Sequence, residues 1–300
     1  MKKFVLGFLG ILFMGLLGTP VQAVNTDNFT ITNYDVQMTL GRDGENRSTL
    51  KTVETITAQF PDYDQNHGLE RVFVKDYNNH PTSFQFRSVT DENSTPLQYH
   101  WSGNALRVGE EKTYVHGLKT YVLTYTQRDV TRFYSDTNKD EFYWDIIGNE
   151  WQVPIQHASL VLNIDASLVR QHTNEAWCYT GMYGSTTQCS GGITADMRTV
   201  PGVSTGEPIV YRAAVDDIGN GKGVTVALGF MKDTFAVYQM SPAERFATIW
   251  IMVQIGMTVV GLATIGWITA RWWSLTNRKK ELGTIVPEYL PPQDASVTTS

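Results

Sequence analysis

The sequence predicts a mainly β protein: an antiparallel β-sandwich that is exported across a membrane and held there by one C-terminal transmembrane α-helix. Three observations support this prediction. An apolar stretch at residues 4–18 follows two lysines, a longer apolar stretch occupies residues 246–270, and the body between them alternates apolar and polar residues in short runs. A period of two is typical of half-buried strands, and about 20 apolar residues are enough to cross a bilayer as a helix.

The first 23 residues have the three parts of a secretory signal peptide. Lys2 and Lys3 form a positive start, residues 4–18 form a short apolar segment, and Val21-Gln22-Ala23 offers small residues for cleavage. A segment of this kind directs export and is then removed. We therefore expect residues 24–240 to form an extracytoplasmic domain.

The expected domain consists of short strands separated by turns rich in Gly, Asn and Asp. No long helical periodicity occurs in it, and an antiparallel sandwich is the usual way to bury this many half-apolar strands. A sub-boundary is an option near residue 154, where an aromatic stretch gives way to a Gly-rich region. The alternating runs are residues 34–40, 50–60, 84–86, 97–101, 106–108, 121–125, 142–146, 158–164, 209–213 and 224–230.

The charge of the exported part bears on its partners. Residues 24–245 hold 27 acidic and 18 basic side chains. A net negative surface argues against nucleic acid and anionic lipid as partners, although such a charge also simply keeps a domain soluble.

Two cysteines, Cys178 and Cys189, lie in the exported part. Disulfides persist in oxidising compartments, so we expect these two residues to form one. A redox pair is the alternative, but the spacing is not C-x-x-C. Two cysteines without further His or Cys ligands are too few for structural zinc.

A transmembrane helix is predicted over residues 241–273, with residues 246–270 in contact with the lipid bilayer. Ser241 and Glu244 form a capping box around Pro242, which suits the first helical position. Basic residues follow from Arg271 onward, so the positive-inside rule places residues 274–300 in the cytoplasm as a short tail. The chain should cross the cell membrane once. Gln254 inside the span suggests helix–helix association, against the alternative of a passive anchor.

Several motifs together resemble one known family. The run Asp140-Glu141-Phe142-Tyr143-Trp144-Asp145 is followed by Gly148-Asn149-Glu150-Trp151 and Val153-Pro154-Ile155. This signature is similar to that of the predicted bacterial membrane proteins of domain-of-unknown-function family 2207. Further similar pieces occur in the same order, at residues 52–57, 67–71, 121–125 and 287–292.

The resemblance implies an extracytoplasmic β domain tethered to a bacterial envelope, and it implies no activity. Proteins of this family usually continue into a cytoplasmic domain and further membrane helices. We therefore expect this chain to be a short variant or a fragment of a longer, multi-span protein.

No residue is predicted to be catalytic, and no cofactor or metal is expected. His67, Glu70 and Arg71 are candidates for a ligand site, since a base and an anion-binding group lie close in sequence. Pairing of Arg71 with a carboxylate such as Glu54 is the structural alternative. The run Asp62, Asp64, Asn66 and Gly68 lacks the Gly and Glu positions of an EF-hand and is interpreted as a turn.

Trp144 and Trp151 are the other candidates for a ligand site, because aromatic rings beside a polar turn can stack on sugars or cover a peptide. The alternative is a place in the sandwich core.

From these observations we predict a non-enzymatic envelope protein whose β domain is a binding or assembly module for an unknown envelope protein or ligand. The alternatives are a membrane-anchored hydrolase around His67 and a ligand-sensing subunit of a signalling complex. The oligomeric state stays open.

Overall fold

The structure is a computed structural model that describes residues 27–134, 136–196 and 209–278. The chain divides into two compact units, Met1–Tyr238 and Gln239–Ser300. The predicted signal peptide and most of the predicted cytoplasmic tail lie outside the described residues.

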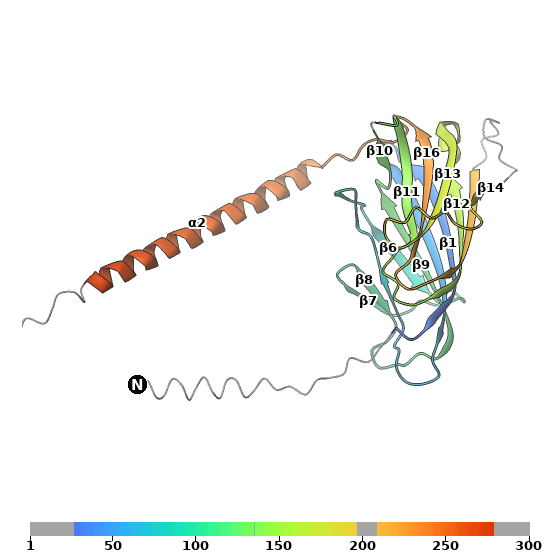
Figure 1. Cartoon of the computed structure of the whole chain (residues 1–300), viewed down its shortest axis with the longest axis horizontal. Coiled ribbons are helices and arrows are strands. Elements are labelled where there is room, and N and C mark those ends of the chain that lie inside the picture. Colours follow the sequence, from blue (N-terminus) through green and yellow to red (C-terminus); the bar gives the residue numbers. More distant parts are fainter. Residues whose placement is uncertain (1–26, 135, 197–208, 279–300) are drawn as a thin grey trace, which may run out of the picture. The chain divides into compact units, whose positions relative to one another are not determined.

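The first unit is built on a seven-stranded sheet (Figure 1). In spatial order its strands are β14 (Ile193–Ala195), β15 (Ile209–Ile218), β12 (Ile155–Ile164), β1 (Thr30–Arg42), β2 (Ser48–Phe60), β9 (Gly117–Arg128) and β6 (Gln85–Thr90).

A second sheet has four strands, in the order β10 (Arg132–Tyr134), β11 (Lys139–Ile147), β16 (Gly223–Met231) and β13 (His172–Gly181). Side chains of the two sheets meet in one core, where the ring of His172 on β13 lies 5.5 Å from that of Tyr211 on β15. One short 3-10 helix, Ala166–Gln171, joins β12 to β13. The predicted mainly β sandwich is therefore confirmed.

One pairing departs from the antiparallel prediction. β1 pairs with β2 in antiparallel fashion but with β12 in parallel, with Val36 opposite Leu160. Because β12 follows Pro154 and shares the sheet with β1, the sheet is not divided at residue 154. Parallel neighbours need a long connection, and here all strands from β2 to β11 lie within that connection.

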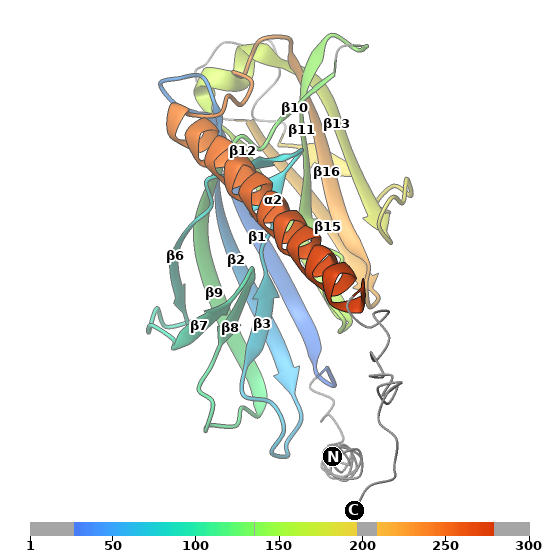
Figure 2. The ribbon, with the colours of Figure 1, turned by 90° about the vertical axis from the view of Figure 1, so that its left-hand side faces the viewer.

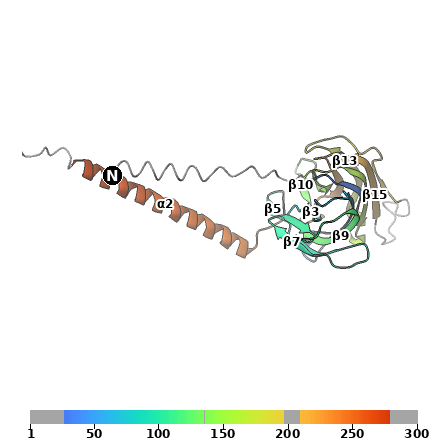
Figure 3. The same cartoon turned by 90° about the horizontal axis from the view of Figure 1, so that it is seen from below.

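A small three-stranded sheet packs on the β2–β9 part of the large sheet (Figure 2). Its order is β3 (Leu69–Val72), β8 (Ala105–Val108) and β7 (Tyr99–Ser102). Phe73, next to β3, touches Tyr125 of β9 edge to face at 5.0 Å. A two-stranded ribbon, β4 (Asp76–Tyr77) and β5 (His80–Pro81), completes the domain. In the view from below, β3, β5 and β7 gather on one side and β15 on the other (Figure 3).

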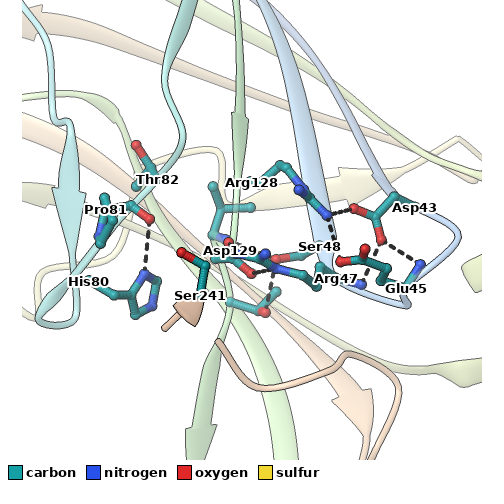
Figure 4. Close-up of polar contacts among 12 residues, drawn as sticks. Asp43, Glu45, Arg47, Ser48, His80, Pro81, Thr82, Arg128, Asp129 and Ser241 are labelled. Atoms are coloured by element: carbon teal, nitrogen blue, oxygen red, sulfur yellow. Dashed lines mark hydrogen bonds and ion pairs between the residues drawn. The ribbon is translucent and has the colours of Figure 1, made fainter. Parts of the chain in front are cut away.

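The turn between β1 and β2 is tied to the end of β9 by ion pairs (Figure 4). Arg47 pairs with Asp129, and Arg128 pairs with Asp43. Burial would raise the pKa of Asp43, but backbone N–H groups of Arg47 and Glu45 and the Arg128 side chain outweigh it and lower that pKa. The turn is therefore fixed to its neighbours by charge as well as by its own backbone.

The second unit contains the helix α2 (Pro242–Arg278). The backbone N–H of Ser241 donates to Glu244 Oε2 at 2.6 Å, and the Glu244 N–H donates to Ser241 Oγ at 3.2 Å. The predicted capping box is confirmed. The helical residues Pro242–Thr276 are long and apolar enough to cross a membrane.

Candidate ligand-binding cavity

A cavity of about 600 Å³ lies in the β domain, between the β3–β8 end of the small sheet and the segment that follows β11. Small-molecule sites in proteins typically measure about 300–1,000 Å³. Its floor is apolar and buried, formed by Phe29, Leu69, Val108, Trp151 and Val153. Its charged and titratable lining residues are Asp27, His67, Glu70, His100, Arg107, Glu110, Glu111 and Glu150.

Two glycines shape the edge of this cavity. Gly68 and Gly109 have φ of +136° and +138°, which L side chains rarely adopt. A Cβ on Gly68 would lie 1.9 Å from the carbonyl oxygen of Val108, and one on Gly109 would lie 1.9 Å from that of His67. The backbones approach so closely that only glycine fits at either position. This contact fixes His67 and Glu110 at the edge.

Strand β3 directs its charged residues to opposite sides. Glu70 is exposed and its Oε2 lies 2.5 Å from Arg107 Nε, at the cavity. Arg71 is buried and binds Glu54 of β2 with two hydrogen bonds, Nε to Oε2 at 2.9 Å and Nη2 to Oε1 at 2.8 Å. The expected pairing of Arg71 with Glu54 is confirmed.

The buried carboxylate of Glu54 also accepts a hydrogen bond from the Tyr125 hydroxyl at 2.6 Å. Burial alone would raise the pKa of Glu54. The Arg71 charge and the hydrogen bonds outweigh burial and hold that pKa below its ordinary value. Arg71 Cζ lies 6.0 Å from the ring centroid of Trp151, so this ion pair supports the cavity floor from behind.

His67 is held at the cavity edge by its neighbours. Its Nδ1 lies 3.2 Å from the carbonyl oxygen of Thr113, and its ring lies 4.3 Å from that of Tyr114. Because a carbonyl can only accept, Nδ1 is the donor in this hydrogen bond.

The two tryptophans predicted as candidates have different places. Trp151 belongs to the cavity floor and meets Tyr34 edge to face at 5.7 Å. Trp144 lies in the core, where its ring stacks on that of Phe142 at 6.2 Å and is tilted against that of Tyr77 at 4.9 Å, and it does not line the cavity. The structure thus brings His67, Glu70 and Trp151 together at one cavity, with Arg71 behind it and Trp144 apart.

Sequence reasoning missed the opposite wall. Gly109, Glu110 and Arg107 come from β8 and the loop after it, about 40 residues from His67. Glu150 also lines this wall. It lies in the aromatic signature, directly before Trp151, and that motif is the sequence feature that could have pointed to it.

The remaining motifs have structural roles. Cys178 and Cys189 form a disulfide with their Cα atoms 5.4 Å apart, as predicted. In the acidic turn, Asp64 Oδ1 lies 3.0 Å from His116 Nε2. Over the described ranges, no group of three or more His, Cys, Asp or Glu side chains is arranged to hold a metal ion.

Over the residues that the structure describes, the fold and the apolar helix define a class: a β-sandwich domain joined to one candidate transmembrane helix. Residues 30–230 match the family described as predicted membrane protein (DUF2207), N-terminal domain. The chain belongs to this family, and the resemblance seen in its sequence is confirmed.

Other comparisons gave distant similarities in fold. No curated protein matches the chain significantly. An M1 zinc metallopeptidase from Deinococcus radiodurans aligns with 10% identity and a TM-score of 0.38, over 66% of this chain and 42% of that one. Native yeast LTA4 hydrolase aligns with 9% identity and a TM-score of 0.41, over 74% and 33%.

A putative protease from Parabacteroides distasonis aligns with 9% identity and a TM-score of 0.34, over 68% of this chain and 41% of that one. The chain spans less than half the length of each of these three proteins. At such scores the similarity gives no basis for assigning peptidase activity.

Proposed function

We propose that the β domain is a non-enzymatic binding module on the outer side of the membrane, and that its ligand occupies the cavity between β3, β8 and the Trp151 segment. One observation carries the proposal: a cavity of about 600 Å³ with a buried apolar floor gathers three residues selected from sequence, His67, Glu70 and Trp151. Apolar floors with a few polar groups are typical of ligand sites.

The rigidity of the walls supports binding. The Gly68–Gly109 contact and the buried Glu54–Arg71 pair hold the floor and edge before any ligand arrives. A preformed site avoids the ordering cost that weakens association.

The hydrolase alternative has less support. The described lining residues include no Ser, Thr, Cys or Lys that could act as a nucleophile, and Glu70 is already paired with Arg107. No observation on the described residues favours the sensing alternative, which would need a second state of the domain.

The test is to block the cavity in the full chain. Gln152 is an exposed residue of the cavity wall, so Gln152→Trp should fill the opening without disturbing the core. Gln37→Trp, on the outward face of β1, is the matched control. Each purified chain is used to capture molecules from solubilised envelope, which are identified by mass spectrometry. We expect a ligand or partner that the parent and Gln37→Trp retain and Gln152→Trp loses. Equal recovery on all three chains would refute the proposal.

A further inference from the structure

We propose that the outer face of the four-stranded sheet carries a second binding site, and that its ligand is a saccharide chain. The site uses none of the residues that line the cavity described above, so the inference goes beyond the proposed function. It rests on a depression of about 190 Å³ whose lining includes Arg132, Tyr143, Asp145, Tyr179 and Thr225.

In this sheet β16 lies between β11 and β13 (Figure 1), and the register of the three strands places aromatic residues on both sides of β16. Tyr143 of β11 and Trp177 of β13 both pair with Ala227 of the central strand β16. In the next row, Tyr179 of β13 pairs with Thr225. Gly223 and Thr225 of β16 line the centre of the depression, and Tyr143 and Tyr179 line its sides. Trp177 and Ala227 form the next row, just beyond the lining.

Exposure shows that these rings are available. Trp177 is 49% exposed although it is large and apolar, whereas Ala227 between the two walls is only 5% exposed. An exposed tryptophan on the edge strand β13, next to a buried alanine on β16, gives a flat apolar surface beside the depression. Aromatic rings of this kind stack on the C–H face of a sugar ring.

The polar groups of the depression include both donors and acceptors. Asp145 of β11 accepts a hydrogen bond from Thr225 at 2.5 Å and has a second carboxylate oxygen. Arg132 of β10 lies with its Cζ 4.6 Å from the centroid of Tyr143 and 5.0 Å from that of Tyr77. Within the described ranges Arg132 forms no ion pair, so its guanidinium is a donor held in place by aromatic rings.

One end of the site is formed by a braced hairpin. Residues 181–185 line the depression, and Tyr183 there is 92% exposed. Ser185 Oγ donates to the carbonyl oxygen of Thr180 at 2.9 Å, and Asn149 Nδ2 donates to that of Gly181 at 3.1 Å. The disulfide closes this same segment, from residue 178 to residue 189, so the cross-link stabilises a wall of the site.

The combination of exposed aromatic rings with hydrogen-bond donors and acceptors favours a saccharide over other ligands. Sugar hydroxyls both donate and accept, which suits a site with one guanidinium, one carboxylate and several hydroxyl groups. An extended peptide usually pairs with the free edge of a strand, whereas this depression lies on the face of the sheet, over β11, β16 and β13. Asp145 repels an anion and Arg132 repels a cation, whereas a ligand without net charge avoids both costs.

The test uses the full chain in phosphatidylcholine nanodiscs, because many detergents carry sugar head groups. Three hexasaccharides are titrated by calorimetry: β-1,4-linked N-acetylglucosamine, β-1,4-linked glucose and α-1,4-linked glucose. We expect saturable binding of at least one, weakened at least about tenfold by Trp177→Ala and by Tyr143→Ala. Trp177→Phe should restore most of the affinity.

Two controls make the outcome decisive. Trp101 on β7 is also partly exposed, at 37%, but lies in another sheet, so Trp101→Ala should leave saccharide binding unchanged. Gln152→Trp should leave it unchanged too, which separates this site from the cavity. Circular dichroism verifies that each variant is folded. The proposal is overturned if none of the three sugars binds, or if Trp177→Ala and Tyr143→Ala bind as the parent does.

Discussion

At the scale of single residues, the buried polar side chains are the most informative. Glu54 lies on the inward face of β2, where the alternating pattern calls for an apolar residue, and its side chain has no exposed surface. A buried carboxylate is costly unless it is paired and hydrogen-bonded. Arg71 and Tyr125 supply that compensation, which makes β2, β3 and β9 depend on one another.

We predict that Arg71→Met destabilises the β domain strongly. The variant leaves the Glu54 carboxylate buried without its partner, and breaking a buried pair in this way typically costs about 3–5 kcal/mol. Chemical denaturation of the solubilised chain, followed by tryptophan fluorescence, measures the loss. The double variant Glu54→Leu, Arg71→Met removes both charges and should be clearly more stable than Arg71→Met alone. If the double variant is as unstable as the sum of both single variants, the two residues do not act as a pair.

His172 predicts a pH dependence. Its Nδ1 accepts the Asn174 N–H at 2.9 Å, its ring touches Phe230, and burial lowers its pKa below 6.5. The unfolded chain therefore takes up this proton at a higher pH than the folded chain does. Between pH 6.5 and the lower pKa of the folded chain, the free energy of unfolding falls as the pH falls, by up to about 1.4 kcal/mol for each pH step of one.

This dependence is measured by denaturation at pH 7.5 and pH 5. Other groups also titrate in this range, so the difference between the parent and His172→Gln isolates the effect. We expect a smaller loss of stability on acidification in His172→Gln. Identical losses in both chains would contradict the assignment.

At the scale of elements, the glycines at the ends of β3 and β8 decide the shape of the cavity. Gly68 and Gly109 meet back to back, each against the carbonyl group that precedes the other. We predict that Gly68→Ala separates the two strands, since its Cβ would lie 1.9 Å from the Val108 oxygen and its φ is +136°. Where an L residue can adopt the native φ, Gly→Ala stabilises a protein by about 0.4–1 kcal/mol, whereas at this incompatible position we expect a loss larger than that gain.

Gly103 is the matched control for this prediction. It also has a positive φ, +61°, but nothing lies within 4 Å of a Cβ built there. Gly103→Ala should therefore cost only the backbone strain, about 1–2 kcal/mol. Melting temperatures of both variants test the comparison, and equal shifts would show that the close approach has no effect of its own.

The elements also differ in how well their sequences reveal them. β2, β9 and β11 alternate regularly, and that pattern predicts them. The same pattern does not predict β13. Its outward residues include Trp177 and its inward side begins with His172, so apolar and polar residues do not alternate along it. The two-residue strands β4 and β5 and the three-residue strands β10 and β14 are too short for any period to show.

At the scale of the whole molecule, the distribution of basic residues predicts which side of the membrane each unit occupies. The basic residues from Arg271 onward predict that the C-terminal end is cytoplasmic and the β domain is outside. We predict that a reporter active only in the cytoplasm works when fused after Ser300 and fails when inserted after Gly206. Activity at both positions, or only at the second, would contradict this topology.

The sequence by itself determined that the domain is mainly β and that a capped apolar helix follows it. It also determined the disulfide pair, the family and the Glu54–Arg71 pairing. These depend on local periodicity, on short spacings, or on a buried charge that needs a partner. Only the tertiary structure decided that β12 lies beside β1 in parallel, and that Trp151 lines the cavity whereas Trp144 does not. It also decided that Gly109 meets Gly68 and that Tyr143, Ala227 and Trp177 form one row. Those contacts join residues tens of positions apart, and strand order, which sets them, leaves no trace in any local pattern.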